Sequence, residues 1–89
     1  MAKFKPILYT ITFKKSVFKD LRKIHKPDVA RITDQINALA ADPRAKGCTK
    51  LSAQELYRVR VGLYRIIYEI RDKQLVVQVI KVGHRSSVY

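Results

Sequence analysis

Residues 56–70, LYRVRVGLYRIIYEI, constrain the fold of this 89-residue chain more than any other stretch. Apolar and polar residues alternate on both sides of Gly62, which is the period-2 pattern of two half-buried strands. A two-residue turn at Gly62 and Leu63 would place Arg60 directly opposite Arg65 in a β-hairpin. The same register gathers the apolar side chains on one face of the sheet, namely Tyr57, Val59, Val61, Tyr64, Ile66 and Tyr68.

The other face of this predicted hairpin carries a cluster of three arginines, Arg58, Arg60 and Arg65. Like charges directly opposite each other destabilise a sheet. Guanidinium groups present a fork of donors that matches phosphate oxygens, so an anionic partner would relieve the repulsion. A solvated polar face without a partner is the alternative for Arg58 and Arg60.

Two amphipathic helices are predicted upstream of the hairpin. Ser16 is a favourable N-cap for the first, which we expect to end near His25 because Pro27 disfavours a helical residue before it. Asp28 can cap the second helix, and residues 42–43, Asp-Pro, would end it. Since the two helices follow each other closely, we expect an antiparallel helical hairpin packed on the sheet.

The remaining strands complete an α+β architecture. Residues 7–13 alternate like a first strand, and residues 75–82 form an apolar last strand that Gly83 is expected to break. Leu51 is expected to fill the edge of the core. The element order is β-α-α-β-β-β, which predicts two helices on one face of a mostly antiparallel four-stranded sheet, in one domain over residues 1–89.

The strongly positive net charge of the chain indicates which classes of partner it can attract. Nineteen Lys and Arg against seven Asp and Glu give a net charge of +12, which attracts nucleic acid, acidic proteins or anionic membranes. No apolar run approaches the roughly 20 residues of a membrane-spanning helix. Residues 1–5 lead into a strand-like segment instead of the apolar core of a signal peptide, and a lone Cys48 fits a reducing compartment. These features predict a cytoplasmic protein without a membrane partner.

The distribution of acidic residues argues against a metal centre. The seven Asp and Glu are scattered, and no His, Asp and Glu cluster has the spacing of metal ligands. Cys48 has no histidine in a triad-like context, so we interpret it as a free thiol. We therefore predict no metal and no other cofactor.

Several segments together resemble the RelE/ParE toxin superfamily, and more specifically its RelE branch. The resemblance covers essentially the whole chain. Its motifs are Leu56-Tyr57-Arg58-Val59-Arg60-Val61-Gly62, Tyr64-Arg65-Ile66-Ile67-Tyr68-Glu69-Ile70 and Val82-Gly83-His84-Arg85 followed by Val88-Tyr89, with Asp42-Pro43, Gly47 and Leu51 upstream.

This resemblance implies a RelE-like fold and the toxin component of a type II toxin–antitoxin system. Such toxins are metal-independent endoribonucleases that cleave mRNA in the ribosomal A site, and a RelB-type antitoxin neutralises them. By the same resemblance, the family's catalytic arginines correspond to Arg65 and Arg85, and its terminal tyrosine to Tyr89. The basic residues of its second strand correspond to Arg58 and Arg60.

Cleavage of RNA by its own 2′-hydroxyl requires a base, an acid and stabilisation of the phosphorane charge. Arginine suits the last role because it stays protonated, so Arg65 and Arg85 are the candidates. The intrinsic pKa of histidine suits proton transfer, and arginines around a tyrosine would lower its pKa. We therefore expect His84 and Tyr89 to share proton transfer, without assigning acid and base.

Four further basic residues are candidates for positioning RNA through its phosphates, namely Arg58, Arg60, Lys46 and Lys50. Such contacts should make binding steeply dependent on salt. Two other functions remain open. The chain could be a ParE-type inhibitor of DNA gyrase, since a shared fold cannot separate the two activities, or a catalytically inactive basic RNA-binding module.

Overall fold

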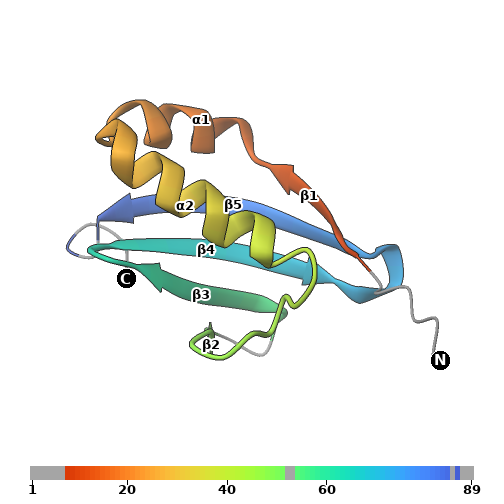
Figure 1. Ribbon diagram of the computed structural model, residues 1–89. Helices are drawn as coiled ribbons and strands as arrows, with labels where there is room; N and C mark the ends of the chain where they lie inside the picture. The colour runs from red at the N-terminus through yellow and green to blue at the C-terminus, as the bar shows by residue number, and fades with distance from the viewer. Residues whose placement is uncertain (1–7, 52–53, 85, 87–89) are drawn as a thin grey trace, which may run out of the picture.

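A computed structural model describes residues 8–51, 54–84 and 86 of the chain. Within these residues, two helices lie over one face of a five-stranded sheet, and none lies over the other face (Figure 1). The strands run in the order β1-β5-β4-β3-β2 across the sheet. Their bounds are Thr10–Phe13 for β1, Thr49–Lys50 for β2, Leu56–Val61 for β3, Tyr64–Arg71 for β4 and Val76–His84 for β5. The helices are α1, Lys15–Arg22, and α2, Lys26–Ala38, and a short 3-10 turn, η1, spans Asp72–Gln74.

The central hairpin of β3 and β4 has the predicted register. Arg60 pairs with Arg65, Val61 with Tyr64 and Val59 with Ile66, so the turn contains two residues. Gly62 occupies its first position at φ 58°, a left-handed conformation that glycine adopts without steric cost. All sheet pairs are antiparallel except β1 with β5, which is parallel.

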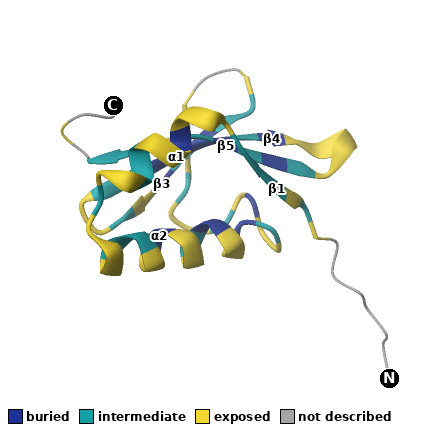
Figure 2. Cartoon of the chain, turned by 90° about the horizontal axis from the view of Figure 1, so that it is seen from above, coloured by how far each residue is buried: buried dark blue, intermediate teal, exposed yellow. Residues whose placement is uncertain are grey.

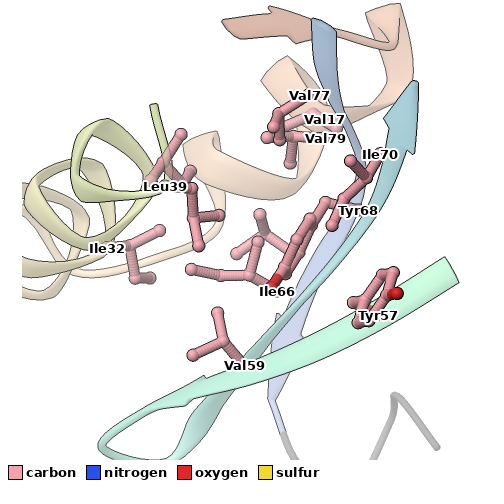
Figure 3. Close-up of a cluster of buried hydrophobic side chains, with 12 residues drawn as sticks. Val17, Ile32, Leu39, Tyr57, Val59, Ile66, Tyr68, Ile70, Val77 and Val79 are labelled. Carbon is pink, nitrogen blue, oxygen red and sulfur yellow. The ribbon is translucent and has the colours of Figure 1, made fainter. Parts of the chain in front are cut away.

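The core lies between the helices and the apolar face of the sheet, as the alternation predicts (Figure 2). Tyr68 is fully buried and stacks on Tyr57 with ring centroids 5.9 Å apart. Figure 3 shows this pair beside the aliphatic side chains that the helices contribute. The buried cluster comprises Val17, Ile32, Ile36, Leu39, Tyr57, Val59, Ile66, Tyr68, Ile70, Val77, Val79 and Val82.

The strand predictions need three corrections. The sheet has five strands rather than four, because Thr49–Lys50 pairs with the start of β3. A two-residue strand carries too little alternation to be recognised in a sequence. Gly83 does not break the last strand: β5 continues to His84, since both residues pair with β4. Leu51 does not fill the core, because it is 37% exposed.

The helix boundaries also differ from the prediction. Lys14 caps α1 and His25 caps α2, in both cases without a side-chain hydrogen bond, so neither Ser16 nor Asp28 is a cap. The helix α1 already ends at Arg22, and α2 ends at Ala38, before the Asp-Pro pair. Asp28 lies in the first turn of α2, where its carboxylate accepts a hydrogen bond from Arg31 and is favourable to the helix dipole.

The strand β5 is a sheet neighbour of β1 over only part of its length. The parallel pairing runs from Thr10 and Val76 to Phe13 and Val79. Beyond it, the backbone N–H of Val82 donates to Oδ2 of Asp20 on α1 at 3.2 Å. Where β1 ends, α1 therefore lies beside the edge of β5 in its place.

Candidate nucleic-acid interface

Three arginines share the face of the sheet that the helices leave uncovered. Arg60 and Arg65 are direct cross-strand partners, and Arg58 lies two residues before Arg60 on the same strand. Residues paired across an antiparallel sheet point to the same face, and so do residues two apart. We call this surface, formed by Arg58, Arg60 and Arg65, the arginine face.

The side chains of the arginine face differ in exposure. Arg60 is exposed, whereas Arg58 and Arg65 are half-buried. The Nε atom of Arg65 is shielded from solvent. A guanidinium group held partly out of water interacts more strongly with an anion than an exposed one does. Within the arginine face, Arg65 is therefore the more shielded side chain and Arg60 the more exposed one.

The surroundings of Arg65 on this face are open on one side. Its partner on β5 is Gly83, which has no side chain. The next pair along the two strands on the same face is Ile67 with Lys81. Ile67 is only 8% exposed although it lies on the open face, in register between Arg58 and Lys81. The long aliphatic stem of its neighbour Arg58 can shield it.

His84 lies on the opposite face of the sheet from Arg65. It pairs with Tyr64, and the two rings meet edge to face with centroids 5.8 Å apart. The imidazole Nδ1 is 2.8 Å from the hydroxyl oxygen of Ser86, and it accepts a hydrogen bond from the Ser86 backbone N–H at 3.2 Å. The sequence alone could not place the imidazole, because we expected the strand to end before it.

Lys50, one of the two candidate lysines, does not join the arginine face. Lys50 pairs with Tyr57, which points to the helix-covered side, and its Nζ lies 3.1 Å from Glu55 Oε2. Lys46 is exposed in the loop before β2. Two more candidates, Arg85 and Tyr89, lie outside the residues that the structure describes.

Arg44 is a structural residue that no pattern in the sequence singles out. Its guanidinium group donates to both carboxylate oxygens of Asp72, to Oε1 of Glu55 and, from Nε, to the hydroxyl of Tyr57 at 3.0 Å. Tyr9 also donates to Asp72, at 2.7 Å. We call Arg44, Asp72, Glu55, Tyr57 and Tyr9 the Arg44 network. It joins the loop before β2 to the start of β3 and to the end of β4, at the end of the sheet opposite the β3–β4 turn.

This network changes the acidity of its two carboxyl groups. Hydrogen bonds from Arg44 and Tyr57, followed by Lys50, lower the pKa of Glu55 to about 2. Hydrogen bonds from Arg44 and then Tyr9 lower the pKa of Asp72 to about 2. Both carboxylates are ionised near neutral pH, so the guanidinium charge of Arg44 is matched by acidic charge within the network.

We also searched the described residues for groups of metal ligands and for membrane-spanning helices. Within residues 8–51, 54–84 and 86, His, Cys, Asp and Glu form no group of three that could hold a metal ion. Among the same residues, no helix is long and apolar enough to cross a membrane.

Solved structures with the same fold are toxins of toxin–antitoxin systems. The toxin–antitoxin complex RelBE2 of Mycobacterium tuberculosis matches with a TM-score of 0.80 at 25% identity, over 94% of this chain and 99% of that chain. The archaeal RelE–RelB complex of Pyrococcus horikoshii OT3 matches with a TM-score of 0.75 at 28% identity, over 88% of this chain and 96% of that chain.

Sequence comparisons agree with the fold. Toxin RelG of Mycobacterium tuberculosis is 29% identical over 85 residues, which cover 91% of this chain and 95% of the relative. The family model described as "ParE toxin of type II toxin-antitoxin system, parDE" matches residues 11–89. That match includes both helices, the whole sheet but for one residue of β1, and the arginine face. The chain therefore belongs to the ParE toxin family of type II toxin–antitoxin systems, within the RelE/ParE superfamily.

Proposed function

We propose that this toxin is a ribosome-dependent, metal-independent endoribonuclease that cleaves mRNA in the A site by attack of the 2′-hydroxyl on the adjacent phosphate. The observation that carries the proposal is the pairing of Arg60 with Arg65 on the sheet face opposite the one that α1 and α2 cover. Two cations held face to face raise the free energy of the unbound protein, and a phosphodiester between them removes that repulsion.

Arg65 is the proposed stabiliser of the phosphorane. It is half-buried beside Gly83, so a phosphate can approach the guanidinium group closely. A single preorganised donor aimed at developing charge contributes roughly 10²–10³-fold in rate. Arg85 is proposed for the same role by resemblance, and it lies outside the described residues.

Proton transfer is proposed for His84 and Tyr89. The imidazole of His84 is at the end of β5, one residue from the Gly83 that faces Arg65, but it points to the other side of the sheet. A 2′-hydroxyl bound at Arg65 would therefore reach His84 only around the end of the strand. His84→Gln tests the role directly, because glutamine keeps a polar side chain but cannot titrate; an unchanged pH profile of cleavage would remove His84 from the mechanism.

RNA positioning is proposed for Arg58 and Arg60, with Lys46 and Lys50 as outer contacts. Lys50 would have to exchange Glu55 for a phosphate, so its contribution should be smaller than that of Arg60. Each phosphate contact adds nearly one unit to the slope of log affinity against log salt. RNA binding by Arg58→Ala and Arg60→Ala should show a reduced slope, whereas Lys73→Ala, at the far end of the sheet, should not.

The partner proposed to neutralise the toxin is a RelB-type antitoxin. Both structural relatives described above are complexes of a toxin with such an antitoxin. The net charge of +12 favours rapid association with an acidic partner. Association that slows steeply with added salt would support this assignment, and salt-independent association would contradict it.

The test of the function uses programmed ribosomes. The wild-type toxin should cut mRNA in the A site in the presence of a metal chelator. An mRNA with a 2′-deoxynucleotide at the scissile position should resist cleavage, since it lacks the nucleophile. Cleavage of the deoxy substrate would refute the proposed chemistry.

A second function has support of its own. The matching family model is described as a ParE toxin, and inhibition of DNA gyrase is the alternative activity that the superfamily resemblance implies. A gyrase supercoiling assay run in parallel distinguishes the two. Inhibition of supercoiling with intact mRNA would favour the ParE-type activity, and neither effect would favour an inactive RNA-binding module.

A further inference from the structure

A cavity of about 330 Å³ opens at the end of the sheet where β4 begins and β5 ends. Its walls come from those two strands and from the end of α1, and they include Lys23, Ile24, Tyr64, Lys81, Gly83 and His84. We infer that this cavity is a nucleotide subsite, which holds the base and phosphate of an RNA residue next to the scissile position. The inference rests on the proposed function, because it takes RNA as the substrate.

The position of the cavity connects it to the arginine face. Gly83 pairs with Arg65 on that face and also lines the cavity. Tyr64, the residue before Arg65, lines the cavity from the helix-covered side. An RNA strand bound at Arg60 and Arg65 would thus cross the backbone at Gly83, which has no side chain to obstruct it, and enter the cavity at the edge of β5.

At this point the edge of β5 faces α1 across the cavity, because the neighbouring strand has ended. The pairing of β1 with β5 stops at Phe13 and Val79. From there Asp20 of α1 accepts the Val82 N–H, and the cavity lies between that helix and the strand. The ribbon places the end of α1 over the end of β5, beside the β3–β4 turn (Figure 1).

The charged groups of the cavity suit a phosphate. Lys23 and Lys81 supply two cations against the single carboxylate of Asp20. Lys81 Nζ is 4.0 Å from Asp20 Oδ1 and its side chain is 50% exposed, so this long contact constrains the lysine weakly. A phosphate can therefore recruit Lys81 without breaking a tight ion pair.

The apolar groups of the cavity suit a base. Tyr64 and His84 meet edge to face, which gives one wall an aromatic surface. Ile24 and Val82 complete the apolar lining. Bases pack on aromatic side chains in single-stranded RNA sites whatever their identity. The cavity volume falls at the lower end of the range for small-molecule sites, which fits one nucleotide better than a larger ligand.

The experiment titrates the purified, full-length toxin with adenosine 3′-monophosphate and, separately, with inorganic phosphate, followed by amide chemical shifts. The nucleotide should shift the amides of Lys23, Ile24, Tyr64, Gly83 and His84 with one common dissociation constant. Inorganic phosphate should shift the same lysine-proximal amides about tenfold more weakly, because it lacks the base.

Two variants separate the contribution of the phosphate to nucleotide affinity from the contribution of the base. Lys23→Ala/Lys81→Ala should weaken nucleotide binding about fivefold or more, whereas the charge-matched control Lys15→Ala/Lys73→Ala, outside the cavity, should bind like wild type. Tyr64→Leu keeps an apolar side chain on the core and should reduce the advantage of the nucleotide over inorganic phosphate. Circular dichroism confirms that each variant is folded.

The inference is overturned if the cavity amides do not respond to the nucleotide, or if the cavity and control double variants bind equally well. Equal affinity for nucleotide and phosphate would also contradict it, because it would reduce the cavity to an anion site. The proposed function fails separately: binding in the cavity without cleavage on ribosomes would refute the nuclease, and cleavage without binding in the cavity would refute only the subsite.

Discussion

Arg44 holds Asp72 through two hydrogen bonds, 3.1 Å from Nη1 to Oδ1 and 2.8 Å from Nη2 to Oδ2. The two residues are 28 positions apart, and the contact ties the loop before β2 to the turn between β4 and β5. The same guanidinium lies over the ring of Tyr57, 5.4 Å from its centroid. One side chain therefore links several segments at the end of the sheet opposite the β3–β4 turn.

Replacing Arg44 by alanine should lower the free energy of unfolding by about 1–2 kcal/mol. The side chain is 41% exposed, so solvent screens each ion pair, and the estimate comes from the several contacts acting together. Urea unfolding measures the change. Arg31→Ala is the matched control, because Arg31 forms an exposed ion pair with Asp28 within α2, and its loss should cost about 0.5 kcal/mol or less. Equal losses of unfolding free energy in the two variants would show that the Arg44 network stabilises the fold no more than a single surface ion pair does.

Acid should weaken the folded state through Glu55 and Asp72. The pKa of each carboxyl group is about 2 in the folded chain, below the ordinary values of 4.5 and 3.8. A lowered folded-state pKa contributes stability above the unfolded value, and that contribution is lost as the pH falls from about 4.5 towards 2.

Urea midpoints measured between pH 6 and about 2 should therefore fall more steeply for wild type than for Arg44→Ala, which lacks the cause of the shifts. Because the chain carries seven acidic residues, only the difference between the two curves is informative. Parallel curves would contradict the assignment of the shifts to Arg44.

Arg60→Thr should stabilise the chain while weakening its binding of RNA. The change removes one of two like charges that face each other across the hairpin, and threonine favours a strand. We expect a gain of about 0.5 kcal/mol in low salt, shrinking as salt screens the repulsion. Urea unfolding at two salt concentrations tests this. A loss of stability at low salt would mean that Arg60 is held by contacts that outweigh the repulsion.

Tyr68→Phe should destabilise the protein although it removes a single oxygen atom. The hydroxyl is buried and donates to the carbonyl oxygen of Pro43 at 2.7 Å, and burial raises the pKa of Tyr68, so the group stays protonated. Its loss leaves a carbonyl without its partner in a buried position, at a cost of about 1–2 kcal/mol. Tyr64→Phe, in a half-buried ring at the sheet's other end, is the control. An unchanged urea midpoint for Tyr68→Phe would indicate that water replaces the hydroxyl.

The fold was largely predictable because its signal is periodic. Alternation around Gly62 defined the hairpin register, and with it the side of the sheet on which Arg58, Arg60 and Arg65 lie. Helix ends were less predictable, because Ser16 and Asp28 are favourable caps by type while the backbone begins each helix one or more residues earlier.

The candidate site was predictable only where it lies on the hairpin. The side of the sheet occupied by His84 depends on β5 passing through Gly83, and on a register shift between Ile67 and Tyr68 that changes which residues face the helices. The Arg44 network depends on contacts between residues far apart in sequence, in a loop without periodicity. No local pattern in PRAKGCTK distinguishes Arg44 from Lys46 or Lys50.

Cleavage by Arg65 variants on programmed ribosomes tests the central claim most directly. Arg65→Ala should reduce the rate of A-site cleavage by roughly 10²–10³-fold, and Arg65→Lys should recover only part of it, because lysine keeps the charge but not the fork of donors. Lys73→Ala should cleave like wild type and controls for the loss of one positive charge. Cleavage at the wild-type rate by a folded Arg65→Ala protein would contradict the account.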